Sequence, residues 1–216
     1  MTDEAAEWRA MQKAGKGIAR CLMRDYPELR PVPDHLRILA LVGKGNNGGD
    51  ALIACAELLA HYPRARVDLI LTGAVDELKP LAARAFKELE GRVQHHRFEA
   101  GSKEEAHELL DSISAAQGFH ICLDGLLGMS FKPPLRSPID LLIEAINDYA
   151  FIDLRAAVDL PSGAGDEPAA LKFAADFSYA TGIAKKPLFQ GIAECGRVRY
   201  LDLGFFKGPE AKTLEG

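Results

Sequence analysis

Residues 43–50 read G-K-G-N-N-G-G-D, and this stretch decides the fold of the chain. It follows an apolar run, R-I-L-A-L-V (37–42), and precedes a helical pattern, A-L-I-A-C-A-E-L-L-A (51–60). A strand, a glycine-rich loop and a helix in this order bring backbone N–H groups and a helix N-terminus to one point, where they bind an anion.

The same loop carries more polar chemistry than phosphate binding requires. Its glycines match G-x-G-x-x-G, the fingerprint of dinucleotide-binding folds, at Gly43, Gly45 and Gly48. The amides of Asn46 and Asn47 and the carboxylate of Asp50 share the turn. A loop that only bound phosphate would not need a negative charge at its end, so we expect further chemistry here.

Strand and helix patterns alternate along the chain. The expected strands are 37–42, 66–72, 92–98, 119–123, 156–160, 176–180 and 197–203, and the expected helices are 4–26, 51–61, 76–90, 103–116 and 138–148. We expect Gly15 and Gly17 to interrupt the first helix and Pro27 to stop it. The alternation predicts an α/β protein with a three-layer Rossmann-like fold, a mostly parallel central sheet and helices on both faces. Residues 1–216 are expected to form one domain, with a frayed tail from Lys207.

Bulk properties narrow the classes of function. A chain of 216 residues with 48% hydrophobic and 26% charged residues fits one globular α/β domain. The net charge of -5 argues against nucleic acid and anionic membranes as partners. The acidic start lacks the basic region of a signal peptide, and no apolar run reaches the roughly 18 residues of a membrane span. Four scattered cysteines indicate reduced thiols and a cytoplasmic location: Cys21, Cys55, Cys122 and Cys195.

Oxygen-bearing side chains follow three of the expected strands. The glycine loop follows the first strand, Asp124 follows the fourth, and Asp159 ends the fifth, just before P-S-G. Open α/β sheets bind ligands beyond the carboxyl ends of their strands, so these groups should share a cleft. Two acids and two amides suit potassium, sodium or magnesium rather than zinc. A strand-end aspartate can also be only a helix cap or turn residue, but three such ends make that account less favoured.

Several longer segments resemble one known family. G-K-G-N-N-G-G-D-A, I-C-L-D-G-L-L-G followed by P-L-R-S-P, and A-V-D-L-P-S-G resemble, in this order, the YjeF N-terminal domain family, the NAD(P)H-hydrate epimerases. M-Q-K-A-G-K-G-I-A-R, A-D-F-S-Y-A-T-G and G-R-V-R-Y-L-D-L-G extend the resemblance over residues 11–204. It implies a Rossmann-like homodimer that interconverts the R and S hydrates of NADH and NADPH (NADHX and NADPHX). A separate dehydratase would act with it, because no such domain follows in this sequence.

The resemblance also implies roles for particular residues. Asp159 would be the catalytic residue and would touch the hydrated ring. One potassium ion per subunit would be held by Asn47, Asp124 and Ser162. Substrate would be bound by Asp159 and by two segments of the chain: Asn46, Asn47, Gly48, Gly49 and Asp50, and Gly128, Met129, Ser130, Phe131, Lys132, Pro133 and Pro134.

Departures from the family pattern keep a second function open. Ala51 stands where the family usually has glycine, Met129-Ser130 replace a small pair, Lys132-Pro133 replace Ser-Arg, and the loop after Gly163 is short. A catalytically degenerate nucleotide-binding or dimerisation module is the alternative. An ordinary NAD(P)-dependent oxidoreductase ranks last, because the second strand ends without a ribose-binding acid. Lys185 and Lys186 read as a solvated turn, with a phosphate contact as the less favoured role.

Overall fold

The structure is a computed structural model that describes residues 3–182, 185–189 and 193–204, and its centre is one parallel sheet. The described strands are β1 (Arg37–Val42), β2 (Arg66–Leu71), β3 (Gln94–Arg97), β4 (Phe119–Gly125), β5 (Ile152–Val158), β6 (Phe177–Thr181) and β7 (Arg197–Leu201). Their order across the sheet is β3-β2-β1-β4-β5-β6-β7, and each neighbouring pair is parallel. The chain therefore winds outward from β1 in both directions, as in dinucleotide-binding folds.

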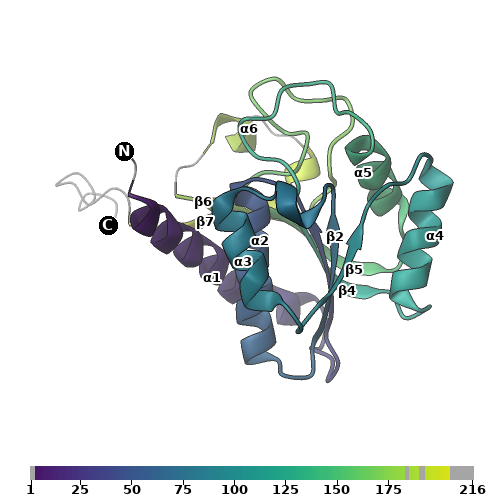
Figure 1. Ribbon diagram of the computed structural model, residues 1–216, viewed down its shortest axis with the longest axis horizontal. Helices are drawn as coiled ribbons and strands as arrows, with labels where there is room; N and C mark the ends of the chain where they lie inside the picture. The colour runs from purple at the N-terminus through teal and green to yellow at the C-terminus, as the bar shows by residue number, and fades with distance from the viewer. Residues whose placement is uncertain (1–2, 183–184, 190–192, 205–216) are drawn as a thin grey trace.

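Helices cover both faces of this sheet (Figure 1). Three of them lie on one face: α1 (Glu4–Leu29), α2 (Asn46–His61) and α3 (Pro80–Leu89). The other face carries α4 (Lys103–Ser114) and α5 (Ile139–Asp148). Short helices complete the described part: η1 (Val75–Glu77), α6 (Lys186–Phe189) and η2 (Ala193–Cys195). The expected three-layer α/β fold is confirmed, and none of the described helices is both long and apolar enough to cross a membrane.

The sequence of β1 explains why it is the central strand. All six of its residues are buried. Ile38, Ala40 and Val42 join the apolar core under α1, α2 and α3, whereas Leu39 and Leu41 join the core under α4 and α5. A strand buried on both faces needs apolar side chains at successive positions, so its apolar run is continuous rather than alternating.

The expectation that glycines interrupt the first helix is wrong, because α1 continues through Gly15 and Gly17. A Cβ on Gly15 would lie 2.5 Å from Cβ of Ile53, and one on Gly17 would lie 2.7 Å from Cδ2 of Leu201. The two glycines therefore let α2 and β7 approach α1 closely. The helical backbone is kept because packing against these neighbours outweighs the conformational cost of glycine.

Two other helix boundaries also differ from expectation. Pro27 does not stop α1, which runs to Leu29 and is closed by a hydrogen bond from Arg30 N to the carbonyl of Tyr26 (3.0 Å). Tyr26 is only 3% exposed, so its packing holds the last turn in place. The segment 76–90 divides into η1 and α3, because Pro80 occupies the first position of a new helix.

The fifth strand begins earlier than its apolar run suggests. β5 spans Ile152–Val158, whereas the sequence indicated 156–160. Its first half alternates between buried and partly exposed residues, with Asp153 and Arg155 on the more open side. Because of these polar residues, a search for continuous hydrophobic runs does not detect the first half of the strand. The expected frayed tail from Lys207 lies outside the described residues.

Candidate functional site

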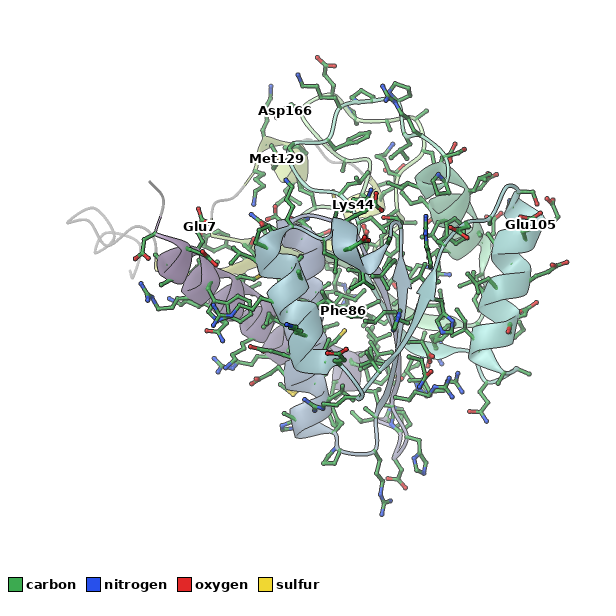
Figure 2. All side chains as sticks on the ribbon, viewed as in Figure 1. Glu7, Lys44, Phe86, Glu105, Met129 and Asp166 are labelled. Carbon is green, nitrogen blue, oxygen red and sulfur yellow. The ribbon has the colours of Figure 1, made fainter. Side chains whose placement is uncertain are left out.

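A cleft lies at the carboxyl ends of β1 and β4, where the winding of the sheet changes direction. Gly43, just after β1, donates its N–H to the carbonyl of Gly125 at the end of β4 (3.1 Å). The cleft has a volume of about 640 Å³ and is walled by the glycine loop, residues 126–131, Asp159 and Lys185. Figure 2 shows Lys44 and Met129 at this end of the molecule, whereas Glu105 projects from the outer side of α4.

The three fingerprint positions are occupied by glycine for different physical reasons. A Cβ on Gly43 would lie 1.9 Å from the carbonyl oxygen of Leu126, and one on Gly48 would lie 2.0 Å from the carbonyl oxygen of Gly43. Both positions therefore exclude any side chain. A Cβ on Gly45, by contrast, would meet nothing within 4 Å, and this residue lines the cleft as the N-cap of α2. Of the three glycines, Gly45 is the one whose Cβ position faces open space that a ligand can occupy.

The structure brings together the three residues that the family resemblance assigned to a metal. Ser162 donates to the two oxygens of Asp124, from its N–H (2.7 Å) and from its hydroxyl (2.7 Å). Asn47 donates from Nδ2 to the carbonyls of Leu127 and Val158, both at 3.0 Å. The N–H of Leu127 in turn donates to the Ser162 hydroxyl (3.0 Å). Segments that follow three different strands therefore meet around Leu127.

The Asp124 carboxylate is buried, and its hydrogen bonds come from neutral groups. It is 1% exposed, and burial raises the pKa of Asp124 to about 6, although hydrogen bonds from Ser162 and Leu126 favour its charged form. Among the described residues no lysine, arginine or histidine pairs with it. A site of amide, carboxylate and hydroxyl oxygens with an uncompensated charge fits a hard cation.

Asp159 has an unusual backbone and a crowded carboxylate. Its φ of 68° lies in the left-handed region, which residues other than glycine seldom adopt and which is often found at functional sites. Its Oδ1 accepts hydrogen bonds from the N–H (3.1 Å) and hydroxyl (3.0 Å) of Thr181. The ammonium of Lys185 contacts the same oxygen. The sequence interpretation placed Lys185 in a solvated turn and missed its contact with Asp159, although its place after β6, at the same edge of the sheet, was a usable signal.

The candidate substrate-binding residues divide between the cleft and its surroundings. Those that line the cleft are Asn46, Asn47, Gly128, Met129, Ser130, Phe131 and Asp159. Those outside its lining are Gly48, Gly49, Asp50, Lys132, Pro133 and Pro134. Gly48, Gly49 and Asp50 lie outside the lining because α2 begins at Asn46, so residues 46–50 form the start of this helix and not an open loop. Ala51 is fully buried next to Gly125, so this departure from the family pattern does not enter the cleft.

Comparisons with known proteins agree with this architecture. The crystal structure of yeast ynu0, YNL200c, superimposes with a TM-score of 0.69 over 89% of this chain and 76% of that chain, at 22% sequence identity. This likeness supports the fold alone.

Named relatives are similar over most of the chain. An NAD(P)H-hydrate epimerase of Candida albicans (strain WO-1) is 28% identical over 177 residues, which cover 75% of this chain and 62% of the relative. One of Elusimicrobium minutum is 27% identical, covering 92% of this chain and 84% of the relative. A bifunctional NAD(P)H-hydrate repair enzyme Nnr of Salinibacter ruber is 28% identical over 90% of this chain but only 36% of its own length. Residues 8–186 match the family model "YjeF-related protein N-terminus", and the chain belongs to that family.

Proposed function

We propose that this protein is an NAD(P)H-hydrate epimerase, which interconverts the R and S forms of NADHX and NADPHX. The observation that carries the proposal is the placement of Asp159. Its buried carboxylate lies in the wall of a cleft at the switch point of a dinucleotide-binding sheet. Relatives that bear this name at 27% and 28% identity support the same activity.

The cleft suits a nucleotide in both size and charge. Its volume of about 640 Å³ lies within the range of roughly 300–1,000 Å³ that is usual for small-molecule sites. Lys44, Lys79 and Lys185 line it, and the N-terminus of α2 opens beside Gly45. Lys185 is paired with Asp159 and Lys44 with Glu77 (3.0 Å), so the ammonium of Lys79 and the helix N-terminus are the groups that attract the phosphates of a dinucleotide substrate.

Asp159 is proposed as the acid–base residue of the reaction. Epimerisation at C6 of the hydrated ring requires the hydroxyl to leave one face and return to the other. The intermediate is a ring cation conjugated with the ring nitrogen. In its protonated form Asp159 donates a proton to the departing hydroxyl, which leaves as water, and the resulting carboxylate takes a proton back from the water that adds to the other face. The carboxylates near the site stabilise the positive ring electrostatically.

One potassium ion per subunit is proposed at Asn47, Asp124 and Ser162. The donor set supports the ion, because all three side chains carry oxygen and the buried charge of Asp124 lacks a cationic partner among the described residues. A bound ion offsets that charge and holds residues 126–131 against the segment that begins at Asp159. Met129 and Ser130 then keep a fixed place in the wall of the cleft.

Cytoplasmic location, a homodimer and a separate dehydratase partner remain part of the same proposal. The bifunctional Salinibacter ruber relative carries the matched segment as 36% of its length. That arrangement supports a second repair activity acting beside this one on the same damaged cofactors.

The deciding experiment measures exchange between purified hydrate epimers. Protein is added to one epimer in buffer with potassium or with tetramethylammonium, and the ratio of epimers is followed by chromatography. Exchange well above the spontaneous rate, and faster with potassium, is expected. Mixing at the spontaneous rate under both conditions would instead favour the catalytically degenerate nucleotide-binding or dimerisation module.

A further inference from the structure

A second, smaller cavity lies on the other side of the first turn of α2. Its volume is about 240 Å³, and it opens between α1, α2, α3 and the end of β6. Met11, Ala14, Leu81 and Leu203 form much of its wall, so the lining is mainly apolar. Glu7 is the only charged residue besides Asp50 among the described residues that line it.

The Asp50 carboxyl lines this cavity, and no residue that the structure describes pairs with it. Asp50 is 8% exposed, and no described group donates a hydrogen bond to its carboxyl or forms an ion pair with it. Burial raises the pKa of Asp50 well above its ordinary value, the charge of Asp159 raises it further, and Lys185 opposes both. Among the described residues, the fully buried side-chain polar atoms without a partner belong to Arg37 and His96, so the Asp50 oxygens reach the open cavity, and a ligand that displaces water there must supply their hydrogen bonds.

The small cavity and the cleft are neighbours. Asn46 lines both of them. Thr181 lines the small cavity and donates its hydroxyl proton to Oδ1 of Asp159, which lines the cleft (3.0 Å). Asp159 therefore lies between the small cavity, which is mainly apolar, and the cleft, which is lined by three lysines.

We propose that the small cavity binds the carboxamide-bearing ring of the substrate, while the cleft binds the nucleotide and phosphate portion. This inference rests on the proposed function and assigns one half of the substrate to the small cavity and the other half to the cleft. The size is sufficient, because an apolar cavity of about 150 Å³ already holds benzene. A neutral carboxylic acid at Asp50 can donate to the amide oxygen and accept from the amide N–H. The apolar wall favours burial of the ring.

Ligand binding to a cavity-filling variant tests the proposal. Ala10, half-buried on α1, lines the cavity, so Ala10→Leu places a larger side chain in it. Ala5→Leu, on an exposed part of the same helix, is the matched control. NADH carries the carboxamide ring and ADP-ribose lacks it, so the ratio of their dissociation constants measures the contribution of the ring. We expect NADH to bind the wild type about tenfold more tightly than ADP-ribose. Ala10→Leu should abolish that difference and leave ADP-ribose binding unchanged.

A second pair of variants tests the carboxyl itself. Asp50→Asn keeps one donor and one acceptor for the amide and should retain most of the preference for NADH. Asp50→Ala keeps neither and should lose the preference. Thermal unfolding of each variant verifies that it is folded before binding is measured.

The outcomes separate this inference from the proposed function. Equal preference for NADH in Ala10→Leu and wild type overturns the subsite, even where the wild type exchanges epimers. Equal weakening of NADH and ADP-ribose, or a wild type with no preference for NADH, overturns it as well. The wild type could also exchange no epimers and still prefer NADH over ADP-ribose, with Ala10→Leu removing that preference. This result would refute the epimerase activity but support the ring-binding site, which would then belong to a non-catalytic binding module.

Discussion

Lys185 and Asp159 share a buried contact that fixes one oxygen of the carboxylate. The ammonium meets Oδ1, which also accepts both hydrogen bonds from Thr181. The side chains of Lys185 and Asp159 are only 18% and 8% exposed. No described group donates to Oδ2, so this second oxygen is available to a substrate. The lysine thus acts as a positioning residue for the proposed acid–base group.

Replacement of Lys185 by methionine should therefore lower kcat more than it alters KM. We expect a fall of about 10- to 100-fold, because the carboxylate loses its orientation and its countercharge. Lys185→Arg keeps the cation and should recover much of the rate. Lys186→Met, at the adjacent exposed position, is the matched control and should behave as wild type. A rise in KM with unchanged kcat would assign Lys185 to phosphate binding.

Asp159→Asn should abolish epimer exchange while the protein stays folded. Asparagine tolerates the left-handed backbone that Asp159 adopts, and it keeps a carbonyl oxygen for Thr181. Loss of acid–base chemistry typically costs about 10²- to 10⁴-fold in rate. Asp166→Asn, an exposed aspartate in the following loop, should leave the rate unchanged. Undiminished exchange by Asp159→Asn would refute the catalytic assignment.

The fold could be predicted from the sequence because the central strands are buried on both faces. β1 shows this as a continuous apolar run from Ile38 to Val42, and β4 as a short apolar run from Ile121 to Leu123 that ends at Asp124. In a parallel sheet such ends lie at one edge, and the meeting of Asp124 and Ser162 was therefore foreseeable.

The remaining details depend on tertiary contacts that a local pattern does not show. Gly15 looks like a helix breaker until Ile53 is known to pack against it. Asn46 and Asp50 looked like members of one ligand loop, but they lie four residues apart on a helix and share the face toward α1. The contact of Lys185 with Asp159 depends on the path of the chain after β6, which no spacing rule fixes.

Two glycine substitutions in the fingerprint should affect different properties, stability in one case and ligand binding in the other. Gly48→Ala forces a Cβ to within 2.0 Å of the carbonyl oxygen of Gly43, so we expect failure to fold or a large drop in melting temperature. Gly45→Ala meets no atom within 4 Å and should change stability by less than about 1 kcal/mol. Its methyl group enters the cleft, so binding of ADP-ribose should weaken. Thermal unfolding and calorimetric titration measure the two effects, and unchanged affinity in Gly45→Ala would argue against a ligand at this loop.

The charge of Asp124 predicts a stability that depends jointly on pH and potassium. The pKa of Asp124 is raised to about 6 in the folded protein from 3.8, so its contribution to stability is complete below pH 4 and is lost as pH rises through 6. Without the ion this loss is about 3 kcal/mol. The proposed potassium ion would bind the ionised form, so its stabilising effect should be absent near pH 4 and present at pH 7.5, reaching about 2.7 kcal/mol at a hundredfold excess over its dissociation constant.

Chemical unfolding in potassium chloride and in tetramethylammonium chloride at equal ionic strength measures this difference, because the larger cation does not fit a site of three oxygen ligands. Asp124→Asn removes the charge that attracts the ion, so the potassium-dependent increment should disappear in this variant. Asp166→Asn makes the same substitution at an exposed aspartate and should keep the full stabilisation by potassium. An increment that is equal at both pH values, or that survives in Asp124→Asn, would place the ion elsewhere, because only the ionised Asp124 couples potassium binding to a proton in this pH range.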